Sequence, residues 1–234
     1  MTERDAGALA RDAEHFRVGP SELRHEGDAY VVDVDEIAVP VPRRLRGRIR
    51  VIPEALTGHE ESLDAAGRHV WRPHAPRARV EVDFRQPGLR WQGTGYLDSN
   101  AGSEPLEAGF RYWTWSRGDA GDEAVILYDA ERRDASHLGL GLRVDRHGAV
   151  TPFEAPPRRT LPGTLWRVHR ETRGEDAARL VRTFEDTPFY NRSRIASRVL
   201  GRNVEMFHEA LDLDRFASRW VQTLLPFRMP RRRR

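Results

Sequence analysis

The chain has 234 residues, of which 39 are basic, 36 are acidic and 38% are hydrophobic. This composition is typical of a folded, turn-rich protein and argues against a disordered chain. Cys and Lys are both absent, which excludes disulfides, thiolate nucleophiles, Schiff-base lysines and phosphate loops ending in Gly-Lys-Ser/Thr. Every basic residue is therefore Arg, and these arginines are interleaved with acids along the whole chain. That interleaving argues against a nucleic-acid-binding protein.

No stretch approaches the roughly 18 uncharged apolar residues that a membrane span needs. The first residues, Met1 to Asp5, also lack the apolar core of a signal peptide. We therefore expect a cytoplasmic protein.

The chain is predicted to begin with a short helix over residues 2–16. Thr2 can cap it, and Leu9 and Phe16 fall near one face. From there the hydrophobic period changes to two, which is typical of half-buried antiparallel strands. Strands are predicted in the first half around residues 30–35, 44–51 and 80–85.

The second half continues the alternation with almost no helical pattern. Its predicted strands cover residues 109–117, 123–131, 137–145, 165–172, 179–185, 191–199 and 203–211. Short strands at regular spacing favour an all-β sandwich or an up-and-down barrel. A seam near 113–121 divides the chain into a first β unit, residues 1–112, and a second, residues 113–234.

Arginine occupies alternate positions of one predicted strand, at Arg44, Arg46, Arg48 and Arg50. This face could bind phosphate groups. Opposite charges on neighbouring strands stabilise a sheet, however, so pairing with Asp33, Asp35 and Glu36 is the favoured interpretation.

Residues 68–117 hold four of the six Trp residues and the compact run Gly93 to Gly102. In a strand, Tyr96, Asp98 and Asn100 project to one face, so a carboxyl lies between a phenol and an amide. His69 and Trp71 have the same spacing upstream. Bringing the two faces together would surround one acid with aromatic side chains. Alternatively, residues 98–102 form a hairpin turn and the Trp side chains are ordinary core.

Several segments resemble the carotenoid 1,2-hydratases, also called hydroxyneurosporene synthases. The similarity covers essentially the whole chain and is most specific in HVWRP (69–73), LRW (89–91), GYLDSN (95–100), GSEPLE (102–107) and FRYWTWSR (110–117). Further similar segments are YDAERRD (128–134), EDTPFY (185–190) and LPFRMP (225–230).

The resemblance implies two lipocalin-like β units and a cofactor-independent hydration of the terminal double bond of acyclic carotenoids such as neurosporene and lycopene. The family positions needed for activity match His69, Trp71, Tyr96 and Asp98. Family members usually carry several dozen residues before the point where this chain begins. We therefore expect either a first unit truncated at its N-terminus, with an open sheet edge, or an internal start codon at Met1.

Hydration of an unactivated alkene needs a strong proton donor, and protonation gives a tertiary carbocation that water captures. A carboxylic acid can act only if it is neutral near pH 7, which apolar surroundings favour. Asp98 is the expected acid, while the rings of Trp71 and Tyr96 could stabilise the cation. His69 either accepts the proton of water or holds Asp98 protonated. The expected substrate-binding residues are Trp91, Asn100, Trp113 and Trp115.

The expected partners are the carotenoid and water, with no metal ion and no nucleic acid. The run Pro230 to Arg234 is either a solvated tail or a contact with anionic lipid, which fits peripheral attachment to the inner face of the membrane. Three alternatives to the hydratase remain open. These are a related terpenoid isomerase or cyclase, a hydrophobic-ligand carrier without turnover, and an inactive truncated copy.

Overall fold

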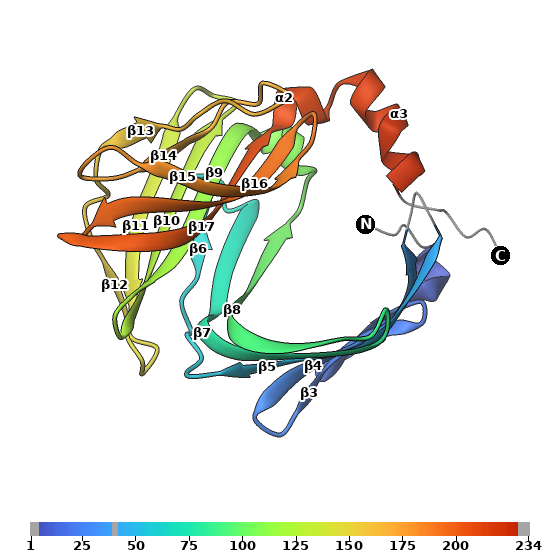
Figure 1. Cartoon of the computed structure of the whole chain (residues 1–234). Coiled ribbons are helices and arrows are strands. Elements are labelled where there is room, and N and C mark those ends of the chain that lie inside the picture. Colours follow the sequence, from blue (N-terminus) through green and yellow to red (C-terminus); the bar gives the residue numbers. More distant parts are fainter. Residues whose placement is uncertain (1–4, 39–41, 229–234) are drawn as a thin grey trace. The chain divides into compact units, whose positions relative to one another are not determined.

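The computed structural model describes residues 5–38 and 42–228, and most of them lie in antiparallel strands (Figure 1). This confirms the all-β prediction. The described helical segments are short: η1 (Ala6–Ala8), α1 (Leu106–Gly109), α2 (Leu213–Phe216) and α3 (Arg219–Arg228). None of these described helices combines the length and hydropathy that crossing a lipid bilayer requires.

The first sheet follows the chain as a meander from β1 to β5, after which β7 pairs with β5. Its order is β1-β2-β3-β4-β5-β7-β6, and β8 also pairs with β7. The strands are β1 (Leu9–Arg11), β2 (His15–Val18), β3 (Ser21–Glu26), β4 (Ala29–Ala38), β5 (Arg43–Pro53), β6 (Glu61–Ser62), β7 (His69–Gln86) and β8 (Leu89–Gly102). The two longest strands, β7 and β8, carry the predicted catalytic residues.

The second sheet has seven strands in the order β12-β11-β10-β9-β17-β16-β15. They are β9 (Phe110–Ala120), β10 (Glu123–Arg132), β11 (His137–Val144), β12 (Val150–Pro152), β15 (Arg179–Asp186), β16 (Tyr190–Val199) and β17 (Arg202–Asp212). A small two-stranded sheet pairs β13 (Arg158–Thr160) with β14 (Glu171–Arg173).

Two predicted elements are wrong. Within the described part of residues 2–16, the helix is replaced by η1, β1 and the start of β2, because Asp12 Oδ1 accepts the backbone amides of Glu14 and His15 and closes a turn. Thr2, the predicted cap, lies outside the described residues. The predicted strand 165–172 is mostly irregular: residues 165 and 166 form a turn, and Arg167 follows with a φ of 57°. Extended pairing there begins only at Glu171.

The described chain groups into two compact units that are not consecutive in sequence. The first consists of residues 1–56, 75–97 and 222–234, and the second of residues 57–74 and 98–221. Because β7 and β8 each contribute to both units, these units do not coincide with the division at residue 112. The division into a first β unit, residues 1–112, and a second, residues 113–234, stays a prediction.

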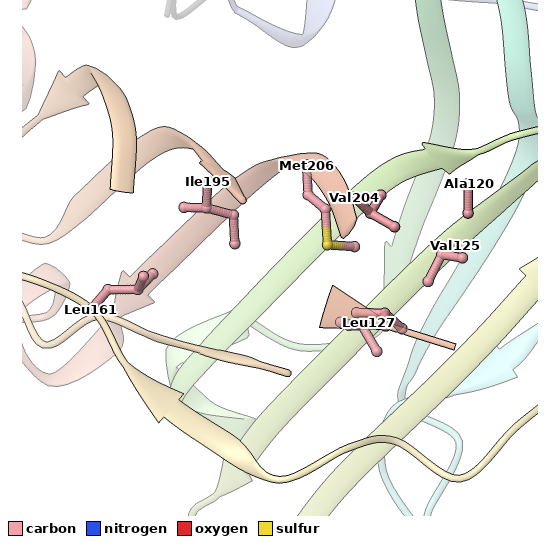
Figure 2. Packing of buried hydrophobic residues seen from close by; sticks show 8 residues of the cluster. Ala120, Val125, Leu127, Leu161, Ile195, Val204 and Met206 are labelled. Atoms are coloured by element: carbon pink, nitrogen blue, oxygen red, sulfur yellow. The ribbon is translucent and has the colours of Figure 1, made fainter. Parts of the chain in front are cut away.

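The core of the second unit lies between apolar side chains on β9, β10, β16 and β17. Figure 2 shows this cluster, whose members are Ala120, Val125, Leu127, Leu161, Ile195, Val199, Val204 and Met206. Alternation along each strand brings these side chains to one face, where burial stabilises the sheet.

A polar layer follows the apolar cluster on the same face. Ser116, His208 and Ser193 are direct neighbours on three adjacent strands, and all three are buried. Ser116 Oγ lies 2.9 Å from His208 Nδ1, and the buried Arg170 donates to Ser193 Oγ at 2.9 Å. Burial and, to a smaller extent, the positive charge of Arg170 together lower the pKa of His208 to about 3, so its imidazole is neutral at physiological pH.

In the first unit, the two faces of the sheet differ as predicted. Val51, Ala75 and Ala78 form an apolar core. The charged face carries cross-strand ion pairs, namely Arg48–Asp33 at 2.7 Å, Arg44–Asp35 at 2.5 Å and Arg50–Glu81 at 3.2 Å. Three arginines of the stripe, Arg44, Arg48 and Arg50, therefore pair with acids. One partner, Glu81, was not among those expected, because it comes from the strand on the other side of β5.

Replacing Ile195 by Ala should destabilise the second unit, because Ile195 is completely buried in the cluster of Figure 2. We expect the free energy of unfolding to fall by about 2–5 kcal/mol in urea titrations followed by circular dichroism. Leu165→Ala is the control, because Leu165 is 87% exposed. Equal losses for both variants would contradict the assignment of this core.

Candidate functional site

The carboxyl of Asp98 is held by a tryptophan on the neighbouring strand. Trp71, on β7, is completely buried, and its Nε1 donates to Asp98 Oδ2 at 2.8 Å. Asp98 is half-buried within β8, so the alternative that residues 98–102 form a hairpin turn is wrong. An indole N–H is only a donor, so Oδ2 acts as an acceptor in this bond.

Aromatic rings from the second sheet lie next to this pair. The ring of Tyr128 lies 5.4 Å from that of Trp71 and 6.0 Å from that of Trp113. Trp115 is the direct neighbour of Tyr128 across β9 and β10, so Trp113, Trp115 and Tyr128 share one face of the sheet. We call Trp71, Trp113, Trp115 and Tyr128 the aromatic wall.

The hydroxyl of Tyr128 remains protonated at neutral pH. Burial raises its pKa well above the usual range, and Asp98 raises it further whenever that carboxyl is ionised. The wall therefore contains one phenol that can donate a hydrogen bond but supplies no negative charge of its own.

His69 is bound to a second carboxylate, that of Asp64. Asp64 Oδ2 accepts the backbone amide of His69 at 2.8 Å and lies 2.9 Å from Nδ1 of its ring. Asp64 Oδ1 accepts the amides of Ala66 and Arg68. Burial alone would raise the pKa of Asp64, but the bonds from His69 and these amides lower it to about 2.

The imidazole of His69 is enclosed on several sides. The Phe110 ring meets it edge-on with 4.9 Å between centroids. A Cβ built on Gly102 would lie 3.0 Å from His69 Cδ2, and one built on Gly109 only 2.7 Å from Cε1. The two glycines thus leave room for the ring, and the Asp64 carboxylate fixes its orientation.

The other predicted site residues have separate positions. Tyr96 is half-buried two residues before Asp98 on β8, in the part of that strand that belongs to the first unit. Asn100 is exposed on the same strand. Trp91 is 47% exposed in the first unit, where it lines a cavity of about 910 Å³ together with Arg46 and Arg85. Roles for Tyr96, Asn100 and Trp91 stay predictions.

Sequence reasoning missed Asp64 and Tyr128. The run Asp64-Ala65-Ala66-Gly67 is typical of a turn in which Asp accepts backbone amides, and this turn leads directly into His69. Tyr128 follows the apolar run Ala124 to Leu127, which indicates a strand buried on both faces. These two signals could have placed both residues near a buried site.

The arrangement combines a carboxyl bound to an indole, a wall of aromatic rings and a histidine bound to a carboxylate. Such a set can donate a proton, stabilise a cation through ring faces and accept a proton. Among residues 5–38 and 42–228, no group of three or more His, Asp or Glu side chains is arranged to hold a metal ion.

Comparison with known proteins gives a consistent result. The family model described as "Carotenoid hydratase CrtC" matches residues 1–234. An acyclic carotenoid 1,2-hydratase of Thiocapsa roseopersicina is 50% identical over 99% of this chain, and one of Rubrivivax gelatinosus is 44% identical over 99%. The chain spans 58% of the length of each of these two relatives.

Among solved structures, kievitone hydratase from Nectria haematococca has a similar fold. Its TM-score is 0.53 at 10% identity, and the match covers 85% of this chain and 71% of that one. At this identity the likeness concerns the fold alone.

A methyl group added at Gly109 would lie too close to the His69 ring. It should therefore displace the ring and strain its hydrogen bond to Asp64. We expect Gly109→Ala to lower the free energy of unfolding by about 1–3 kcal/mol and to shift the ring signals of His69 in NMR spectra. Gly163→Ala is the matched control, because a Cβ there meets no atom within 4 Å. Unchanged His69 signals in Gly109→Ala would disprove the enclosure.

Proposed function

Because this chain belongs to the carotenoid hydratase family, we propose that it adds water across the terminal double bond of an acyclic carotenoid such as neurosporene or lycopene. The observation that carries this proposal is the Asp98 carboxyl, bound to the Trp71 indole beside Tyr128. Hydration adds H and OH without changing the overall oxidation state, so the reaction requires no redox cofactor. The substrates of the relatives named above support the choice of substrate.

The first step is protonation of the alkene by Asp98. Because Oδ2 already accepts the Trp71 indole N–H, Oδ1 is the position that we propose for the proton of the neutral acid. Transfer of this proton to the less substituted carbon leaves a tertiary carbocation and the Asp98 carboxylate. This step requires Asp98 to be protonated before it meets the alkene.

The aromatic wall is suited to stabilise the tertiary carbocation that this protonation produces. Aromatic ring faces attract cations, an effect worth about 2 kcal/mol or more when the groups are desolvated. Trp71 is buried and Tyr128 nearly so, and Tyr96 is the further ring expected to help. Trp113 and Trp115, which share the face of Tyr128, are the residues that we propose contact the long polyene.

Capture of the cation by water completes the reaction. The water loses one proton when its oxygen bonds to the tertiary carbon. His69 either takes this proton or keeps Asp98 in its acid form.

Asp98→Asn should abolish hydration, because an amide cannot supply the proton. With lycopene in detergent, we expect the product heavier by one water to fall by about 10²–10⁴-fold, measured by mass spectrometry. Asp83→Asn is the control, because Asp83 is an exposed carboxylate on the neighbouring strand. Full activity of Asp98→Asn would overturn the assignment of the acid.

The product made by the unchanged protein distinguishes the alternative functions. An isomer of lycopene would indicate a cyclase or isomerase, and bound, unchanged lycopene would indicate a carrier.

We also propose that the protein collects its substrate at the cytoplasmic surface of a membrane. Leu165, Trp166 and Trp220 in the second unit are 87%, 44% and 49% exposed, and the two indoles lie 6.2 Å apart. Exposed Trp and Leu are typical of surfaces that enter the lipid headgroup region. The Pro230 to Arg234 run, which could add attraction to anionic lipid, lies outside the described residues.

Charge introduced at this apolar surface should weaken membrane contact. We expect Leu165→Glu combined with Trp166→Glu to lower sedimentation with vesicles of phosphatidylcholine and phosphatidylglycerol by about tenfold. The control is Phe207→Glu, which adds a carboxylate at a ring that is 50% exposed elsewhere in the same unit. Equal binding by both variants would exclude Leu165 and Trp166 as the contact.

A further inference from the structure

The carboxylate of Asp64 has no role in the steps proposed above, but it binds the side chain and the backbone of His69. Asp64 is 8% and His69 4% exposed. The carboxylate accepts three backbone amides, from Ala66, Arg68 and His69, at 2.8–3.2 Å. With these donors in place, it is ionised at neutral pH and can only accept hydrogen bonds.

This state of Asp64 determines where the proton of His69 lies. The Nδ1 atom is 2.9 Å from Asp64 Oδ2, so Nδ1 must carry a hydrogen to form the bond. In a neutral imidazole, the other nitrogen is then an acceptor. Asp64 thereby selects the tautomer with a hydrogen on Nδ1 and a lone pair on Nε2.

The Nε2 atom is buried, and it has no hydrogen-bond partner within the described part of the chain. A buried polar atom without a partner is costly unless water or a ligand satisfies it. His69 and Trp71 alternate along β7 on the same face, and Trp71 binds Asp98. The side chain with this unpartnered lone pair is therefore on the same face of β7 as Trp71, which binds the proposed acid Asp98 of β8.

We propose that Asp64 is a positioning residue that holds His69 with its Nε2 lone pair ready to accept the proton of the attacking water. This inference rests on the proposed function. As the oxygen bonds to the carbocation, one proton moves from the water to Nε2 and gives an imidazolium that Asp64 stabilises. Asp98 has lost one proton to the alkene, so transfer of one proton from His69 to Asp98 restores the site.

Asp64 also organises the turn that precedes His69, so a loss of activity alone would not separate positioning from folding. Asp64→Asn makes the distinction, because Oδ1 of Asn can still accept the Ala66 and Arg68 amides. Its NH₂ group, however, would replace Oδ2 and would face both Nδ1 and the backbone amide of His69, so that the hydrogen bond from this amide to Oδ2 is also lost. We expect the ring to adopt the other tautomer, with the hydrogen on Nε2.

The first measurement is the protonation state of the two His69 ring nitrogens by long-range ¹H–¹⁵N NMR, with signals assigned from His69→Gln. We expect a protonated Nδ1 in the unchanged protein and a protonated Nε2 in Asp64→Asn. The second measurement is hydration of lycopene. We expect Asp64→Asn to lower kcat by about 10²–10⁴-fold, as for loss of a general base.

Asp145→Asn is the matched control. Asp145 also lies in a turn of the second unit and accepts the amides of His147 and Ala149, but no histidine ring nitrogen. We expect it to leave both the His69 signals and kcat unchanged. Adding Asp64→Asn to His69→Gln should lower kcat by less than about twofold further, because the two residues act as one unit.

An unprotonated Nδ1 in the unchanged protein, or an additive loss in the double variant, would overturn the role of Asp64. If the unchanged protein does not hydrate lycopene, the proposed function fails instead. The nitrogen signals would still report the tautomer in that case, so the two failures are distinguishable.

Discussion

The burial of both faces of the second sheet at β9 and β10 is the constraint on which the rest depends. Leu127 belongs to the apolar cluster on one face, and Tyr128 to the aromatic wall on the other. A sheet with one solvated face would present Tyr128 to water. Because Trp71 packs on Tyr128, the carboxyl bound to Trp71 lies next to apolar rings, where the electrostatic effect of each polar contact is larger than in water.

The site contains two aspartates whose surroundings differ in kind. Asp64 accepts three backbone amides and an imidazole N–H, which together fix a negative charge. Asp98 accepts an indole N–H from a residue that is itself part of the aromatic wall. The opposite tasks proposed for the two residues need such a difference, since one carboxyl would stabilise a developing imidazolium while the other would release a proton.

The alternation of apolar and polar residues was enough to predict most strands, because this period-two pattern is contained within each segment. The arginine stripe of β5 illustrates this, since its pairing with acids follows from charge alone. The elements that failed were decided by turns. Asp12 closes a turn within the predicted helix, and Arg167 adopts a left-handed conformation within a predicted strand. Neither Asp12 nor Arg167 disturbs the hydrophobic pattern, so the pattern could not reveal these breaks.

For the site, the spacing of His69, Trp71, Tyr96 and Asp98 indicates which faces they share, but not which side chains touch. That depends on how β7 pairs with β8, and the structure joins Trp71, rather than His69, to Asp98. The sequence also does not show which side chains Asp64 and Tyr128 contact. Asp64 reaches the site from the turn before His69, and Tyr128 reaches it from the second sheet. Partners of this kind depend on non-local packing. A buried histidine that enters its strand from an Asp-containing turn should therefore be examined together with that Asp.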